Sequence, residues 1–447
     1  MSRIAFILLL AWSNLCCHRT FGLNISFVPS NVEVFVDAEI EVEVVFQGTN
    51  EERLKESNFT TSAQPEWNVG SSFNKSSIRC DGQTVDRCNG TVVVRGRFLG
   101  FGNVSVSRQD PETGQWTGSS LEVAVLRQDK LINKIFTAFV AAVVSINYIN
   151  MGCALDLGIV KSVLKRPIGP AVGFVCQFGI MPLVSYGVGL LLFDDPVLRL
   201  GLFTFGSSPG GGASNMWTVL LGGNLNLSIT MTFVSTVAAL GTLPMWLFTL
   251  GKTILKGTNI VIPFQNILTS LAALIIPIGL GILIQKRFPR VAARAKLILA
   301  PVCIILLISI IVMASVANSY IFFMLTWRMV IGASLSVWAG FAAGFLASFA
   351  FRFPMDDIIA IAVETGIQNS GIAFILLSYS LKAPVSDMAS VVPVAGSIIT
   401  PIPLFIIYCV QRCRNKCLRS ENFELKSINP NNKVKDKGED NNGYEAK

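Results

Sequence analysis

The sequence predicts an α-helical polytopic membrane protein of about nine spans, preceded by a small β-sandwich-like ectodomain. Hydrophobic residues make up 51% of the 447 residues and charged residues only 14%, whereas a soluble domain carries about 25% charged residues. Nine apolar segments follow residue 130, each near the ~20 residues that a spanning helix needs. The region before them is polar and alternates in hydrophobicity. Together these observations predict two differently built parts.

Residues 1–22 are expected to be a signal peptide. Arg3 precedes a short apolar core at residues 4–12, which is too short to span a bilayer. Its removal would take away His18, the only histidine of the chain. The mature protein would then lack histidine, which excludes Ser-His-Asp and Cys-His catalysis, histidine metal sites and histidine proton relays.

Residues 23–130 are predicted to form a glycosylated extracellular β-rich domain. Residues 31–46, 92–98 and 121–127 alternate with the period of half-buried strands, which favours a small β-sandwich. Five sequons in one segment, next to a signal peptide, favour the secretory lumen. These sequons start at Asn24, Asn58, Asn74, Asn89 and Asn103.

Cys80 and Cys88 are the only cysteines of this region. In an oxidising compartment we expect a disulfide between them within a local hairpin. Two free thiols are the alternative.

Residues 131–410 are predicted to be a transmembrane transporter domain, and residues 411–447 a polar, disordered cytosolic tail. The nine apolar segments cover residues 131–157, 168–193, 199–222, 224–250, 261–285, 296–318, 328–350, 357–381 and 386–410. An extracellular N-terminus and nine spans place the C-terminus in the cytosol. We therefore expect a multi-pass protein of the plasma membrane.

The charged residues agree with this orientation. Basic residues gather at 161–166, 286–296 and 412–419, all in predicted inside segments, as the positive-inside rule requires. The predicted outside loops carry Asp194 and Asp195 or few charges, with Lys252 and Lys256 as exceptions. The net charge of +8 therefore reflects membrane topology, and no nucleic-acid partner is expected.

The third and eighth apolar segments carry unusual polar residues. In the third, SSPGGGASNMW at residues 207–217 combines a proline with three glycines, so an interrupted helix is expected there. In lipid such an interruption persists where it lines a cavity or is held by neighbouring helices. In the eighth, Glu364 lies inside an apolar run. A carboxylate at this depth costs roughly 2.5 kcal/mol or more, so a functional role with a partner is favoured.

Further polar side chains follow helical spacing. Ser228 and Thr232 lie four residues apart, as do Glu364 and Gln368, so each pair shares one helix face. The second segment carries Gln177. For Ser228 and Thr232 alone, bonds back to their own helix are the competing explanation.

The third and eighth segments are also alike. Residues 213–215 and 367–369 both place a polar residue before an asparagine, among small residues. Paired interrupted segments indicate a transporter of inverted repeats with its site near the midplane. Carboxylate, amide and hydroxyl oxygens around Glu364 suit sodium better than zinc or copper. The expected partner of the glutamate is therefore an ion.

Five motifs in this order resemble the sodium/bile acid cotransporter family, over about residues 146–408. They are GCALDLGIVKSVLKRPIG, QFGIMPL, SPGGGASN, NLSITMT and ETGIQNS, starting at Gly152, Gln177, Ser208, Asn226 and Glu364. The large ectodomain resembles an orphan subgroup of that family. The resemblance implies a core domain, in which the third and eighth spans are discontinuous helices that cross, and a panel domain that moves against it.

The resemblance also implies two sodium sites and no other cofactor. By motif position the first would use Ser214, Asn215, Ser228, Thr232 and Glu364, and the second Gln177, Gln368 and Glu364. The implied function is sodium-coupled symport of an amphipathic organic anion, such as a bile acid or a steroid conjugate.

Two other function classes compete with a transporter. An intramembrane aspartyl protease would have Asp156, Asp356 and Asp357 as its candidates, but the last two follow Arg352 in a predicted inside loop, where charge is ordinarily solvated. A non-transporting receptor or adhesion protein would act through its ectodomain. It predicts degraded ion ligands, and every position above retains an oxygen-bearing side chain.

Overall fold

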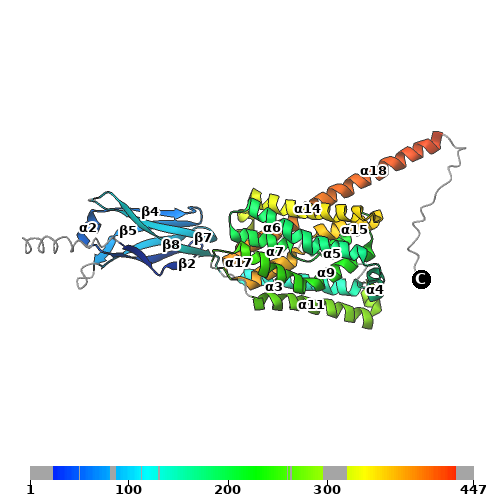
Figure 1. Ribbon diagram of the computed structural model, residues 1–447, viewed down its shortest axis with the longest axis horizontal. Coiled ribbons are helices and arrows are strands. Elements are labelled where there is room, and N and C mark those ends of the chain that lie inside the picture. Colours follow the sequence, from blue (N-terminus) through cyan, green and yellow to red (C-terminus); the bar gives the residue numbers. More distant parts are fainter. Residues whose placement is uncertain are drawn as a thin grey trace, which may run out of the picture.

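The computed structural model describes residues 24–49, 51–80, 87–111, 113–128, 131–258, 260–261, 264–294 and 320–428. A β-sandwich and a bundle of helices lie end to end along the long axis, and α18 projects from the far end of the bundle (Figure 1). The predicted signal peptide, the sixth apolar segment and the end of the tail lie outside the described residues.

The sandwich has two four-stranded sheets within the described residues, ordered β1-β3-β6-β5 and β2-β8-β7-β4. Strands β2 and β8 pair in parallel, and the other neighbours are antiparallel. The strands are β1 (Asn24–Val28), β2 (Asn31–Phe35), β3 (Glu39–Gln47), β4 (Asn58–Gln64), β5 (Val69–Cys80), β6 (Arg87–Gly96), β7 (Gly100–Gln109) and β8 (Trp116–Leu126).

Alternation along the strands builds the core of the sandwich. In β3 and β6, Val44, Phe46, Val92 and Val94 turn inward and are buried, while their neighbours other than Val45 are half-buried or exposed, as a strand with one covered face requires. The alternating stretch at 31–46 is not one strand, because the chain turns at Asp37, whose φ is 63°. Strands β2 and β3 therefore belong to different sheets.

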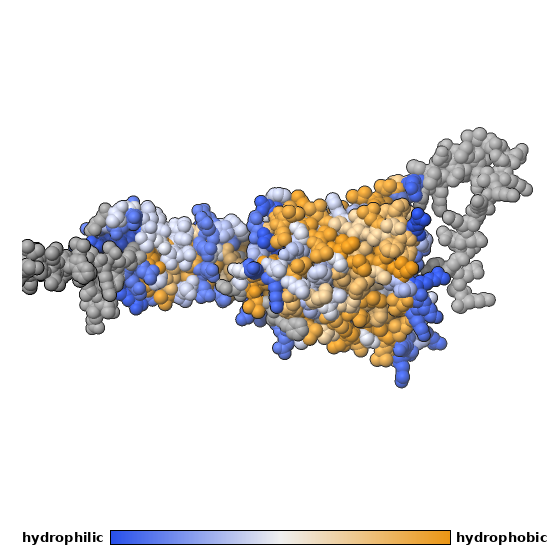
Figure 2. Space-filling view, in the orientation of Figure 1, coloured by the Kyte–Doolittle hydropathy of each residue, from blue (hydrophilic) through white to orange (hydrophobic). Residues whose placement is uncertain are grey.

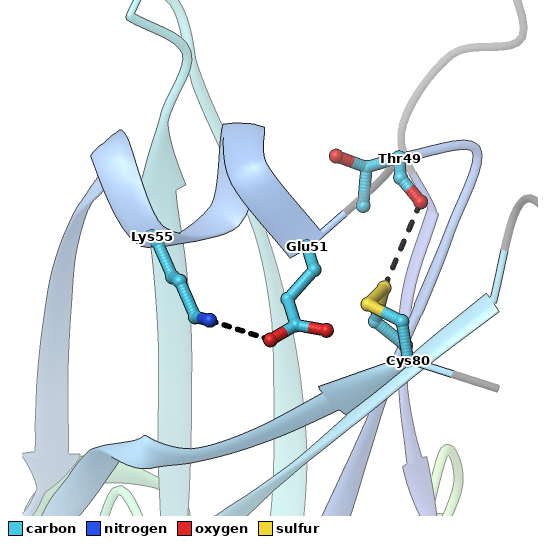
Figure 3. Close-up of a disulfide and its surroundings, with 5 residues drawn as sticks. Thr49, Glu51, Lys55 and Cys80 are labelled. Atoms are coloured by element: carbon cyan, nitrogen blue, oxygen red, sulfur yellow. Dashed lines mark hydrogen bonds and ion pairs between the residues drawn. A yellow bond between two sulfur atoms is a disulfide. The ribbon is translucent and has the colours of Figure 1, made fainter. Parts of the chain in front are cut away.

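A disulfide between Cys80 and Cys88 joins the ends of β5 and β6. Figure 3 shows it beside the short helix α2 (Glu51–Glu56), with Thr49 nearby. The first turn of α2 is tied to its last by an ion pair of 2.5 Å between Lys55 and Glu51. This end of the sandwich is thus covalently closed.

The helical part follows the predicted apolar segments, but several segments contain two or three helices. Its elements are α3 (Leu131–Ala154), α4 (Leu157–Leu164), α5 (Ile168–Val175), η1 (Cys176–Ile180), α6 (Met181–Leu192), α7 (Pro196–Gly206), α8 (Ala213–Leu220), α9 (Leu225–Trp246), η2 (Leu247–Gly251), α10 (Lys252–Ile254), α11 (Phe264–Arg287), α13 (Tyr320–Met324), α14 (Trp327–Ala350), α15 (Met355–Gly366), α16 (Ser370–Ser380), α17 (Val385–Ile399) and α18 (Pro401–Ile428).

Six helical stretches of the described chain are long and apolar enough to cross a membrane. Figure 2 shows hydrophobic residues covering the side of the bundle, with hydrophilic residues gathered at both ends. The third and eighth predicted segments do not form single helices long enough to cross a membrane, because each is interrupted. They contain shorter apolar helices, such as Pro196–Gly206 and Ser370–Ser380. The protein is thus a helical membrane protein, and the count of nine spans stays a prediction.

Candidate functional site

Two interrupted helices meet in the middle of the bundle. Helix α7 ends at Gly206 and α8 begins at Ala213, while α15 ends at Gly366 and α16 begins at Ser370. The amide of Gly211 donates to the Ile367 carbonyl at 2.8 Å, and the amide of Asn369 donates to the Pro209 carbonyl at 2.9 Å. Each break therefore satisfies backbone groups that the other break frees, as lipid surroundings demand.

The glycines of the first break allow this close approach. A Cβ on Gly211 would lie 2.9 Å from the Gln368 carbonyl oxygen, and a Cβ on Gly210 would overlap the Glu364 carboxylate. Side chains at these positions would push the two breaks apart. The glycine run is thus a packing requirement of the crossing.

Glu364, in the last turn of α15, is 1% exposed. Its Oε2 accepts a hydrogen bond from Ser214 Oγ at 2.5 Å and lies 3.0 Å from Thr232 Oγ1 and 3.3 Å from Ser228 Oγ. Thr232 Oγ1 also lies 2.9 Å from the Ser228 carbonyl oxygen of its own helix. Its Oε1 has no hydrogen-bond partner among the described residues. One carboxylate oxygen is thus surrounded by hydroxyl groups, and the other is a buried acceptor without a donor.

Asn215 completes this group from the first turn of α8. Its Oδ1 accepts from Ser228 Oγ at 3.0 Å and lies 3.5 Å from Thr232 Oγ1. The hydroxyls of Ser228 and Thr232 therefore sit between the asparagine and glutamate oxygens. The structure brings together all five residues of the first implied site, from α8, α9 and α15.

Gln177 lies in η1, a π-helical turn, a distortion often found at functional sites. Its Nε2 donates to Gln368 Oε1 at 2.7 Å and to the Ser208 carbonyl at 2.8 Å. Its own Oε1 has no partner among the described residues. Gln177 thus bridges both breaks.

A small cavity of about 10 Å³ is lined by Gln177, Ser235 and Glu364, together with apolar residues. This is about the space of one water molecule. Two of the three residues of the second implied site, Gln177 and Glu364, therefore border a space for one small ion, whereas Gln368 does not line it. Buried oxygens, two of them without donors, suit a hard monovalent cation because they offer oxygen ligands and one negative charge.

A larger cavity of about 400 Å³ lies on the other side of the crossing. Its walls include α3, α8, α13, α16 and α17, together with both breaks, and none of its described lining residues is charged. Tyr148 and Asn147 contribute polar groups from α3, and Asn369 Nδ2 donates to the Tyr148 hydroxyl at 2.6 Å. Gln368 lines this cavity and also bonds to Gln177, which places it between the two spaces.

Sequence reasoning missed Tyr148 and Asn147 as site residues. The polar cluster in INYIN at residues 146–150, inside an otherwise apolar segment, is the signal that could have found them. Thr218, whose Oγ1 donates to Ser228 Oγ at 3.3 Å, was also missed because its role depends on the α8–α9 contact.

The aspartates considered for a protease have structural roles. Asp156 caps α4, with its Oδ1 accepting from the Gly158 amide at 2.8 Å. Asp357 accepts from Asn224 Nδ2 at 2.8 Å, and the Asp356 carbonyl accepts from the Asn224 amide. These bonds give the carboxylates of Asp156 and Asp357 a structural role at helix ends, whereas Asp356 takes part only through its backbone.

Comparison with known proteins decides the family. The model of the sodium bile acid symporter family matches residues 141–324. The ileal sodium/bile acid cotransporter of Cricetulus griseus is 30% identical over 306 residues, covering 67% of this chain and 86% of the relative. This chain belongs to the sodium bile acid symporter family.

Other members are similar at the same level. The human (Homo sapiens) ileal sodium/bile acid cotransporter is 29% identical over 287 residues, or 63% of this chain and 81% of the relative. The sodium-dependent organic anion transporter of Bos taurus is 32% identical over 254 residues, or 56% and 67%. Members of the family are transporters and not enzymes, so the protease hypothesis has no support from the relatives.

Proposed function

We propose that the protein is a sodium-coupled symporter of an amphipathic organic anion, with sodium as its only coupling ion. The observation that carries the proposal is the Glu364 carboxylate, buried among hydroxyl and amide oxygens at the crossing of two broken helices. A bound sodium ion would supply the positive charge that this carboxylate lacks, and the family relationship supports sodium coupling.

The sodium ligands of this proposal are Ser214, Asn215, Ser228, Thr232 and Glu364 for one ion, and Gln177, Gln368 and Glu364 for a second. Shared use of Glu364 would couple the two ions. Gln368 also lines the large cavity, so substrate and ions would meet at one residue.

The large cavity supports an amphipathic substrate. Most of its lining side chains are apolar, with aromatic residues such as Phe136, Trp217 and Phe374, which suits a steroid-like body. The substrate's negative charge would face the starts of α8 and α16, since Ala213 and Ser370 border the cavity and helix N-termini attract anions. Bile acids and steroid conjugates both have this chemistry.

The same proposal includes the topology and domain plan expected from the sequence. The sandwich and the free end of α18 lie at opposite ends of the bundle (Figure 1), which supports an extracellular N-terminus and a cytosolic C-terminus. Helix α4, which contains Lys161 and is followed by Lys165 and Arg166, lies at the α18 end. This supports a plasma-membrane protein with its basic loops inside.

Uptake of labelled organic anions into cells that express the full chain tests the proposal. Bile acids, steroid sulfates and a small hydrophilic anion should be compared in sodium and in choline medium. We expect uptake of at least one amphipathic anion in sodium only. Equal uptake in the two media, or no uptake of any amphipathic anion by protein shown to be at the surface, would contradict it.

A further inference from the structure

The sandwich is attached to the helical part by more than the connecting chain. Arg127 follows β8, and its Nη2 lies 3.1 Å from Asp387 Oδ1 on the first turn of α17. The same guanidinium lies over the ring of Tyr320 in α13, 4.7 Å from its centroid. The Tyr320 hydroxyl donates to Asp387 Oδ1 at 3.2 Å. One arginine of the ectodomain thus binds two helices of the bundle.

A second attachment is apolar. Leu99, in the turn between β6 and β7, is 2% exposed and belongs to the same buried cluster as Phe136 and Phe374 of the bundle. Phe98 beside it packs against that cluster. The tip of the sandwich therefore enters the hydrophobic core of the helical part.

Both attachments reach the walls of the large cavity. Phe136 of α3, Phe322 of α13 and Pro393 of α17 line that cavity, and the three helices carry the residues that hold the sandwich. Helix α3 is joined to Arg127 through a short stretch of chain. The sandwich thus connects three cavity walls at one end of the bundle.

The arginine contact is shielded, unlike an ordinary surface ion pair. The side chains of Arg127 and Asp387 are 27% and 13% exposed. Those of the pair Arg328 and Asp194, also on the predicted outer side, are 49% and 94% exposed. Exposed pairs contribute little, whereas breaking a shielded pair leaves a charge without its partner. The Arg127 contact is therefore able to hold two elements together.

We propose that the β-sandwich is an outer latch of the transport cavity. Arg127, Asp387, Tyr320 and Leu99 hold the outer ends of α3, α13 and α17 together, and the cavity opens to the extracellular side when these contacts separate. Alternating access requires one group of helices to move against another. A contact made only in the outward-closed arrangement shifts the population toward that arrangement. This inference rests on the proposed function, because the cavity is taken as the substrate path.

A cysteine reporter in the cavity tests the latch without any transport measurement. Ser397 lines the cavity and is half-buried. In the full chain at the surface of intact cells, Ser397→Cys would be labelled with a charged, membrane-impermeant methanethiosulfonate. The chain without this substitution gives the background.

We expect Arg127→Gln and Asp387→Asn each to raise the labelling rate of the reporter by about fivefold or more, the range of ordinary allosteric couplings. The double variant should label no faster than either single one, because both substitutions remove the same contact. Leu99→Ala should also raise the rate, through the apolar attachment. Arg328→Gln is the matched control, because it breaks an exposed ion pair on the same side. The labelling rate of Ser397→Cys in this variant should equal its rate in the chain with an unmodified latch.

Surface biotinylation gives the amount of each variant at the surface, and labelling is expressed per surface molecule. Unchanged rates in Arg127→Gln, Asp387→Asn and Leu99→Ala would overturn the latch, as would an equal rise in Arg328→Gln. If one latch variant does not reach the surface, the other two decide the question. A latch found by labelling would stand even if the transported anion differed from the proposed class.

Discussion

Burying the Glu364 carboxylate costs free energy, and its surroundings offset part of that cost. Three hydroxyl groups lie within hydrogen-bonding distance of one of its oxygens, and they replace part of the lost hydration. The other oxygen has no donor among the described residues. A carboxylate kept in this state implies a cation that binds it in the working protein.

We predict that Glu364→Gln removes stabilisation by sodium while the protein still folds and reaches the surface. The amide keeps the size of the side chain but cannot neutralise a cation, and a neutral group is cheaper to bury. In the wild type, sodium at ten times its dissociation constant would add about 1.4 kcal/mol to the free energy of unfolding. Thermal unfolding of the purified pair in sodium and in potassium measures the difference.

A purely structural role for Glu364 gives the opposite result. If the carboxylate only joined α15 to α8 and α9, sodium would stabilise the two proteins equally. Equal sodium-specific shifts of the unfolding temperature would therefore reject the ion site.

At this scale the sequence predicted much of the site. Glu364 was expected to matter because of its depth, whereas Ser228 and Thr232 were assigned to its site by the family resemblance, since their spacing alone also fitted bonds back to their own helix. The three side chains do converge. The bond from Gln177 to the Ser208 carbonyl could not be predicted, because it depends on the π-helical turn. Tyr148 was missed because its partner Asn369 comes from a distant part of the chain.

At the scale of elements, the crossing depends on how closely the two breaks approach. Gly210 pairs with Gln368 in an isolated β-bridge, and Gly211 accepts no Cβ without displacing the opposite backbone. The proline and glycines predicted the first break correctly. That the two breaks meet was expected from the likeness of the third and eighth segments and from the family resemblance, whereas the backbone bonds between them could not be predicted, because no local pattern encodes a contact over that distance.

We predict that Gly210→Ala lowers the free energy of unfolding by about 1–3 kcal/mol, the usual cost of overpacking, and weakens sodium activation. The added methyl group would overlap the Glu364 carboxylate, so that side chain would have to move away from Ser214. Thermal unfolding and a sodium titration of uptake measure the two effects.

Gly241→Ala is the matched control for this change. Gly241 lies within α9, and no heavy atom of the described structure lies within 4 Å of where its Cβ would be. Since alanine favours helix by about 1 kcal/mol over glycine, this variant should be as stable as wild type or slightly more stable. A Gly210→Ala protein with unchanged stability and sodium dependence would show that the crossing tolerates a side chain.

At the scale of the whole molecule, the sequence predicted two parts and the structure adds how they are joined. Alternation and sequons indicated the sandwich, and long apolar segments indicated the bundle. The contact of Arg127 with Asp387 was not predictable, because an arginine at the end of a strand and an aspartate at the start of an apolar segment both look like solvated charges. Likewise Leu99 reads as an ordinary turn residue.

We predict that four of the five sequons are glycosylated in the folded protein. Asn24, Asn58, Asn74 and Asn103 are exposed, whereas Asn89 is half-buried in the central strand β6, with its Oδ1 buried and without a partner in the described structure. A glycan there would have to displace the residues that bury this amide oxygen. Each Asn→Gln change at the exposed sites should increase gel mobility, and Asn89→Gln should not.

Glycosidase treatment of the wild type should remove the mass of all four glycans at once. An unshifted band from cells able to glycosylate would contradict the extracellular position of the sandwich. So would antibody labelling of a C-terminal tag on unpermeabilised cells.

The mutual hydrogen bonds of the two breaks also constrain how the chain is made. Until α15 and α16 have been synthesised, the Gly211 amide and the Pro209 carbonyl lack the partners that they have in the finished protein, and such groups cost several kcal/mol each in hydrocarbon. We therefore expect that the first interrupted helix does not enter lipid as soon as it leaves the ribosome. It would stay in a hydrated site, such as the insertion machinery, until the second interrupted helix has been synthesised. The rate at which the two interrupted helices pair would then limit biogenesis of the protein. A chain truncated before Met355 lacks the second of them and would be a substrate for quality control.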